Sequence, residues 1–180
     1  MKEITRIATI MLGSNTLEFQ KLATLLETNP NLFEEHGLVE AYALDDWWSD
    51  GDVDQSLFLC AFAEKHGYLL TLDWTGEDEP GELEAFIQNR LIALNASSMT
   101  FNFIKTWEET LNWEDLERGD YIIEKLKRVD FELRKIGYVI AIYDLGWDSY
   151  SIFIAQEVDF SDIHPIEFAG QFSIFGTIDL

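Results

Sequence analysis

The sequence predicts an α+β fold in which helices pack on one face of a mainly antiparallel sheet. Apolar residues recur at helical spacing in several segments, and short apolar runs of strand length follow glycine-tyrosine pairs. Two further strand-like runs are joined by a short loop, as in a β-hairpin. The 180 residues include three prolines and no linker-like tract, so we expect a single domain over residues 1–180.

The first predicted elements are two helices separated by an acidic stretch. The segment Ile4 to Leu12 fits a short helix or a strand. The next helix starts at Ser14 or Asn15 and ends at Asn29-Pro30. The helix after the acidic stretch is capped by Asp50 or Asp52 and ends at Gly67. Their apolar stripes are Phe19, Leu22, Ala23 and Leu26 in one, and Val53, Leu57, Cys60 and Ala61 in the other.

The middle of the chain predicts a strand, a helix and a second strand. Residues 68–74 form an apolar run of strand length, and Pro80 suits the first turn of a helix over Leu83 to Leu94. The apolar stripe of this helix is Leu83, Phe86, Ile87, Leu91 and Leu94. Met99 to Ile104 alternates in polarity, which predicts a half-buried strand. Thr106 and Glu109 have the spacing of a capping box and predict the start of a short helix.

The last part of the chain predicts the longest helix followed by a hairpin. Asp120 can cap that helix, and Gly137 ends it. The runs "YVIAIYDL" and "SYSIFIAQEV" then predict two strands joined around Gly146. Residues 163–180 predict a short helix and a final extended segment. The stripe of the long helix is Ile122, Leu126, Val129, Leu133 and Ile136.

One segment echoes another seventy residues later: "EKHGYLLTLDW" (64–74) resembles "RKIGYVIAIYD" (134–144). Both run from a helix through Gly-Tyr to an apolar strand and an acidic loop. An internal helix-strand duplication explains the similarity. Chance also explains it, because any helix that stops at a glycine before an apolar strand has a similar residue pattern. Both explanations stay open.

Charge is the strongest global signal. Thirty-four acidic and 12 basic residues give a formal net charge of −22. Such a surface repels nucleic acids and anionic membranes, and it serves either solubility or binding to a basic partner. No apolar run approaches the about 20 residues that span a bilayer, and the first residues do not resemble a signal peptide. We therefore expect a cytoplasmic protein.

No motif predicts a catalytic residue, a metal site or a cofactor. The three histidines are isolated, and phosphate-binding loops and serine elbows are missing from the sequence. The single cysteine, Cys60, lies among apolar residues and reads as a buried side chain.

Three acidic loops are the candidate binding sites, because each combines carboxylates with tryptophan. Such loops can bind basic side chains, coordinate a cation or supply an acid/base pair. Helix capping and turn formation explain many of the same aspartates. The candidates are Asp45, Asp46, Trp47 and Trp48; Asp73, Trp74, Glu77 and Asp78; and Asp144, Trp147 and Asp148.

The stretch from Gly137 to Ile163 resembles an uncharacterised bacterial family known only as a domain of unknown function. The resemblance rests on a Gly-x-Asp-Ser-Tyr hairpin at Gly146 to Tyr150, and on Leu72, Asp73 and Trp74. It covers most of the chain and implies no activity. More loosely, the chain resembles acidic immunity proteins of bacterial toxin systems, including those of the yeast cell-wall-regulator superfamily. That likeness implies a protein that covers a basic site on a partner.

Together these observations favour a non-enzymatic, cytoplasmic interaction protein, of the immunity or inhibitor type, that binds a basic protein. The alternative is a metal- or carboxylate-dependent small-molecule enzyme or binding protein with its site at the acidic strand-end loops. The sequence leaves the oligomeric state open.

Overall fold

The computed structural model describes residues 2–49, 53–112, 116–117, 119–164, 166–168 and 172–180. The chain divides into two compact units, Met1–Leu69 and Leu70–Leu180. The expectation of a single domain over residues 1–180 stays a prediction. Among the described residues, no helix has the length and apolar character needed to cross a membrane.

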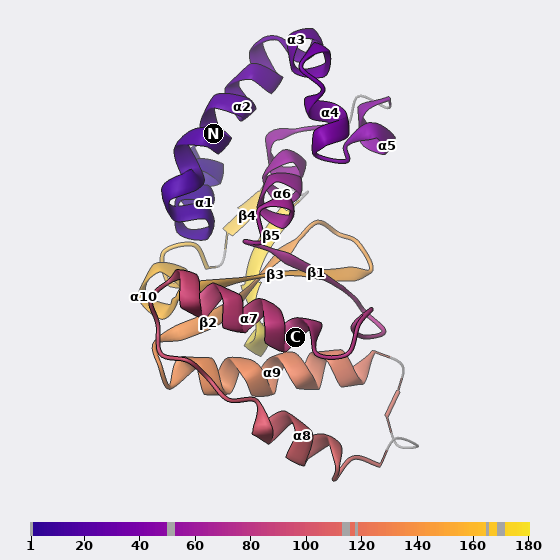
Figure 1. The fold of residues 1–180 in the computed structure, drawn as a ribbon, viewed down its shortest axis with the longest axis vertical. Helices are drawn as coiled ribbons and strands as arrows, with labels where there is room; N and C mark the ends of the chain where they lie inside the picture. Colours follow the sequence, from indigo (N-terminus) through magenta and orange to yellow (C-terminus); the bar gives the residue numbers. More distant parts are fainter. Residues whose placement is uncertain (1, 50–52, 113–115, 118, 165, 169–171) are drawn as a thin grey trace. The chain divides into compact units, whose positions relative to one another are not determined.

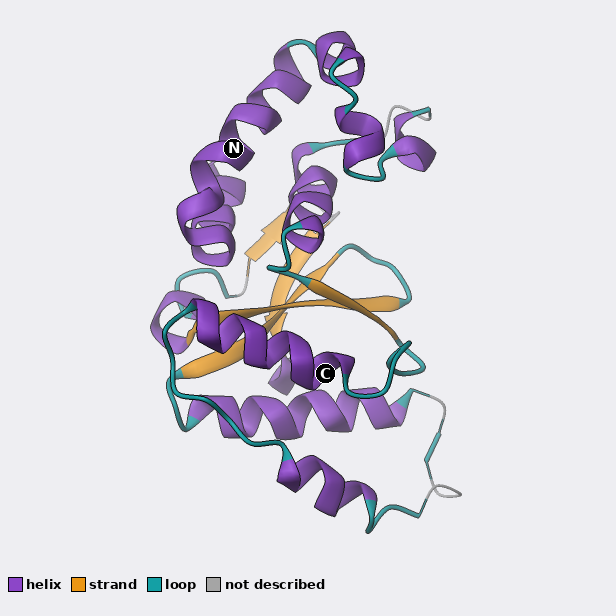
Figure 2. Cartoon of the chain, in the orientation of Figure 1, coloured by secondary structure: helices purple, strands orange, loops and turns teal. Residues whose placement is uncertain are grey.

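The first unit is built from helices and loops (Figures 1 and 2). The ambiguous segment near the start is helical, and α1 and α2 both pack on α6. The helix α6 is buried nearly all round, beyond the single face that the sequence predicts. The elements are α1 (Lys2–Leu12), η1 (Gly13–Asn15), α2 (Thr16–Thr28), α3 (Pro30–Glu35), α4 (Leu38–Ala41), α5 (Asp45–Trp48) and α6 (Gln55–Lys65).

Aromatic rings form the core of this unit. Phe58 stacks on Phe19 at 5.6 Å between ring centroids and meets Phe33 edge to face at 5.4 Å. Tyr42 packs on both Phe58 and Phe62. Such pairs add about 0.5–1.5 kcal/mol each beyond the burial of their area, so these rings fix the short helices between residues 30 and 48 onto α6.

The second unit is a five-stranded antiparallel sheet with helices (Figure 1). The strand order is β1-β3-β2-β5-β4, and every neighbouring pair is antiparallel. The strands are β1 (Leu70–Asp73), β2 (Tyr138–Asp144), β3 (Ser149–Gln156), β4 (Ile166–Phe168) and β5 (Phe172–Gly176). The helices are α7 (Glu82–Ala93), α8 (Asn102–Glu108), α9 (Asp120–Arg134), α10 (Glu157–Phe160) and η3 (Thr177–Asp179).

The predicted α+β class is confirmed, with α7 and α9 packed against one face of the sheet (Figure 1). The face is made by alternate residues of β1, β2 and β3, as a period of two requires. The predicted stripes of α7 and α9 supply the other half of the core. The fully buried side chains are Leu72, Ile140, Ile142, Ile152 and Ile154 from the sheet, and Leu83, Ile87, Leu91, Ile122, Leu126, Val129 and Leu133 from the helices.

The strand predicted over Met99 to Ile104 is wrong, because this segment leads into α8. Thr106 does not open a helix either: its hydroxyl donates to the carbonyl of Asn102 within α8. Helical spacing places Ile104 in the core, and three residues later Trp107 stacks on Tyr121 at 5.6 Å. The helix therefore buries Ile104 and leaves Met99, Phe101 and Phe103 only partly buried.

The N-caps of α6 and α9 also differ from the predicted ones. Asp54 caps α6, with its Oδ1 accepting from the backbone N–H groups of Ser56 and Leu57. The predicted caps Asp50 and Asp52 lie outside the described residues. The N-cap of α9 is Gly119, and a Cβ there would lie 2.9 Å from Cε3 of Trp74. The φ of +99° at Gly119 also favours glycine. Glycine at this position therefore lets the start of α9 pack closely on the ring of Trp74.

The predicted hairpin of β2 and β3 is confirmed, with Tyr138 opposite Gln156 and Tyr143 opposite Ser151. The echoing glycines Gly67 and Gly137 both follow helices and have φ of +69° and +81°. Both therefore act as helix stops, which either explanation of the echo requires. The C-terminal part differs from the prediction: the described residues after Ile163 form β4, β5 and the short helix η3.

Candidate acidic turn surface

The register of the sheet brings two of the predicted acidic loops together. Strands β1 and β2 each pair antiparallel with β3 and therefore run in the same direction, with β3 between them. Asp73 at the end of β1 lies opposite Ser149, and the N–H of Trp74 donates to the carbonyl of Asp148 at 3.4 Å. The ends of both echoing strands thus meet at one end of the sheet.

Three of the predicted residues are exposed there and are called the acidic turn surface: Asp73, Trp147 and Asp148. Trp147 is 42% exposed, which is unusual for so large an apolar side chain. Asp73 also shapes its turn, since its Oδ1 accepts from the N–H and the hydroxyl of Thr75. Asp78 is exposed as well, in the loop that leads to α7.

Asp144 has a more internal position at the end of β2. Its Oδ1 accepts from the N–H of Gly146 at 2.8 Å, and its Oδ2 accepts from the hydroxyl of Ser173 at 3.3 Å. These bonds shape the β2–β3 turn and fasten it to β5. The half-buried Asp144 therefore has the turn-forming role that its position at a strand end suggests.

Glu77 lies inside the unit and belongs to a buried charged cluster that the sequence did not reveal. Its Oε1 accepts from the N–H of Leu83, and its Oε2 lies 2.6 Å from Nζ of Lys125. The same Nζ lies 3.0 Å from Oε1 of Glu84. Lys125 is 2% exposed, so this cluster joins the β1–α7 loop and α7 to α9 without access for a partner.

Tyr121 extends this cluster toward α8. Its hydroxyl donates to Oε1 of Glu108 at 2.6 Å. Burial, this hydrogen bond and the nearby carboxylates of Glu108, Glu77 and Glu84 raise the pKa of Tyr121 above its usual value. The phenol therefore stays neutral and remains a donor throughout the physiological range.

The predicted residues of the first unit lie in α5, a single helical turn. Asp45 and Asp46 are exposed in its first turn, where negative charge suits the helix dipole. Trp48 stacks on Phe33 at 5.8 Å, so its ring belongs to the edge of the aromatic core. Trp47 is half-buried. This loop presents carboxylates, with its tryptophans partly inside.

Within the part of the chain that the structure describes, no group of three or more His, Cys, Asp or Glu side chains is arranged to hold a metal ion. The carboxylates of Asp73 and Asp144 instead accept hydrogen bonds from their own turns. The chemistry available at the acidic turn surface is ion pairing, and stacking of a cation on Trp147.

Comparison with protein families supports the resemblance seen in the sequence. Residues 3–169 match the model of a family described as a domain of unknown function, DUF6630. No curated protein and no solved structure matches the chain significantly. The match spans both units and far more than half of the 180 residues. The chain therefore belongs to the DUF6630 family.

Proposed function

We propose that this chain is a non-enzymatic interaction protein, of the inhibitor or immunity type, that binds a basic partner protein through the acidic turn surface. One observation carries the proposal. The β1–β3–β2 register brings the exposed Asp73 to the same end of the sheet as the exposed Trp147 and Asp148.

An exposed tryptophan next to carboxylates suits lysine and arginine side chains. A cation over an indole ring gains about 0.5–1 kcal/mol at an exposed site and about 2 kcal/mol or more once the pair is desolvated. Tryptophan is also enriched among the residues that dominate binding at interfaces. The net charge of −22 would speed the approach of a basic partner and make binding weaken with salt.

The proposal places the protein in the bacterial cytoplasm. The chain has a single cysteine, the buried Cys60, and so cannot form an internal disulfide. An acidic protein that covers a basic site on a partner needs no cofactor and no membrane contact.

The test is affinity capture of the tagged protein from its native lysate, followed by mass spectrometry. Asp73→Asn/Asp148→Asn removes two charges and keeps an oxygen that can accept the turn hydrogen bonds. Glu34→Gln/Glu35→Gln removes the same charge from exposed residues of the first unit and is the matched control. Trp147→Ala removes the exposed ring.

We expect one stoichiometric basic protein with the wild type and the control, lost when salt rises above about 0.5 M, where screening is strong. Capture should fail with Asp73→Asn/Asp148→Asn and with Trp147→Ala. Equal capture by all four proteins, or no basic partner with the wild type, would refute the proposal.

A further inference from the structure

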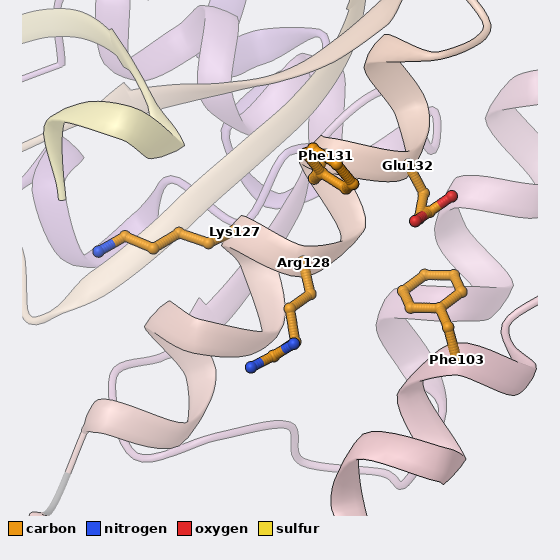
Figure 3. A pocket seen from close by; sticks show the side chains of 5 residues that line it. All are labelled: Phe103, Lys127, Arg128, Phe131 and Glu132. Carbon is orange, nitrogen blue, oxygen red and sulfur yellow. The ribbon is translucent and has the colours of Figure 1, made fainter.

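A groove lined mainly by apolar and basic side chains lies between α8 and α9. It consists of two adjoining hollows of about 310 and 380 Å³ that share Phe103 and Glu132. Figure 3 shows Phe103 on one helix, with Arg128, Phe131 and Glu132 on the other. Lys135 and Ile136 are among the residues that line the second hollow. We call these two hollows the α8–α9 groove.

Phe131 lines the groove with an apolar ring that is open to solvent. This ring is 63% exposed, although Leu126, Val129 and Leu133 of the same helix are fully buried. It lies off the core stripe of α9, on the helix surface nearest the groove. Met99, Phe103 and Ile136 add partly buried apolar surface along the groove. The groove therefore combines one exposed ring with partly buried apolar side chains, next to charged side chains.

The charges of the groove are opposite in sign to those of the molecule. Five of the 12 basic residues of the chain lie between residues 125 and 135. Lys127, Arg128 and Lys135 line the groove with one acid, Glu132, which gives a local charge of +2 (three bases minus one acid). The molecule carries −22. Charges farther apart than about 8 Å are largely screened at physiological salt, so the local cations determine what binds.

Aromatic contacts hold two of these cations at the groove. The Arg128 guanidinium lies 4.7 Å from the ring centre of Trp107, and Nζ of Lys135 lies 4.5 Å from that of Phe131. Lys135 also pairs with Glu132 at 2.6 Å. Lys127 lines the edge of the groove, and its side chain extends away from Phe103 and Glu132 (Figure 3).

We propose that the α8–α9 groove binds a short acidic peptide segment of a partner protein. An aromatic or aliphatic side chain of that segment would cover Phe131 and Phe103, and carboxylates on either side of it would pair with Arg128 and Lys135. The two open, adjoining hollows suit an extended segment, whereas drug-sized ligands are usually buried in one concave pocket. The basic side chains that line the groove favour carboxylates in its occupant.

The probe is a library of randomised twelve-residue peptides displayed on phage and selected on the full-length protein. We expect enriched sequences that combine aspartate or glutamate with one bulky apolar residue. Fluorescein-labelled copies of the enriched peptides, measured by fluorescence anisotropy, should bind Phe131→Ala and Arg128→Gln at least tenfold more weakly. No enrichment, or enriched peptides that bind these variants as well as the wild type, would overturn the proposal.

Two matched controls separate local from general effects. Ile92 on α7 is exposed to the same 63% as Phe131, and Lys21 on α2 is an exposed base like Arg128. Ile92→Ala and Lys21→Gln should leave peptide affinity within twofold. Enrichment of basic peptides that depend on Trp147 would support the acidic turn surface and count against the groove. Dimerisation of the wild type that Phe131→Ala abolishes, seen by sedimentation, would assign the groove to a second copy and overturn the proposal.

Discussion

Asp130 is the residue that fastens α9 to the sheet. Its carboxylate is 4% exposed; Oδ1 accepts from the N–H of Ile140, and Oδ2 accepts from the hydroxyl of Thr177 and from Nε of Arg134. These partners come from β2, η3 and α9 itself. A buried carboxylate is tolerated when its oxygens are satisfied in this way.

Removal of this carboxylate should destabilise the second unit strongly. Asp130→Ala leaves the buried N–H of Ile140 without its acceptor, so we expect a loss of about 2–4 kcal/mol in the free energy of unfolding. Urea denaturation measures it. Glu109→Ala, at an exposed acid, is the control and should stay within about 0.5 kcal/mol. A loss below 1 kcal/mol for Asp130→Ala would contradict this role.

Asp179 predicts a pH dependence of stability. The N–H of Gly176 and the ring of His164 hold the pKa of Asp179 below its usual value. A carboxyl with a lowered folded pKa adds stability above its unfolded pKa of about 3.9, and this stability is lost as pH falls through the folded value. The window therefore lies below about pH 4.

Melting temperatures of the wild type and Asp179→Asn, measured between pH 5 and pH 3, check this dependence. The wild type should melt higher at pH 5, and the difference should shrink toward pH 3 as Asp179 is protonated. Because the carboxyl is largely exposed, the effect should be small. A difference that stays constant over this range would show that Asp179 acts without its charge.

Helical periodicity identified which residues of α7 and α9 are buried, because one face of each helix packs on the sheet. The partners of Asp130 in β2 and η3 could not be predicted, since Ile140 and Thr177 lie 10 and 47 residues further along the chain. The groove did leave a sequence signal: Phe131 falls off the stripe of α9 and stands among Lys127, Arg128 and Lys135.

At the scale of elements, the buried cluster around Lys125 clamps α7 onto α9. Lys125→Met leaves the carboxylates of Glu77 and Glu84 without their cation, and we expect a loss of about 3–5 kcal/mol in unfolding free energy. Adding Glu77→Gln and Glu84→Gln should restore at least half of it, because no buried charge then remains unpaired.

Urea denaturation of the single and triple variants measures this coupling. Were the triple variant less stable than Lys125→Met alone, the carboxylates would have a role other than charge balance, such as the hydrogen bond from Leu83 to Glu77.

Element prediction succeeded where sequence pattern and tertiary packing agree. The β2–β3 hairpin is an example, since both strands are apolar runs around a glycine turn. It failed at Met99 to Ile104, because a short segment of alternating polarity fits both a strand and a helix until the element that it packs on is known. The partner here is α9, whose Tyr121 stacks on Trp107 and makes a helix the better-packed solution.

At the scale of the whole molecule, the basic residues are concentrated in one segment of the sequence. The chain carries −22, yet 5 of its 12 bases fall between residues 125 and 135. The sequence indicated the acidic loops as candidates and could not tell which would be exposed. In the structure, Asp73, Trp147 and Asp148 are exposed. Glu77 lies inside the unit, where it pairs with the buried Lys125.

The central claim is that a basic partner binds the acidic turn surface. The most direct measurement is the amount of captured partner retained at 150 mM salt by Asp73→Asn/Asp148→Asn, relative to Glu34→Gln/Glu35→Gln. Both variants lose the same charge, so the ratio isolates the local contribution. We predict at least a tenfold lower retention for Asp73→Asn/Asp148→Asn. Equal retention by the two variants would contradict the claim.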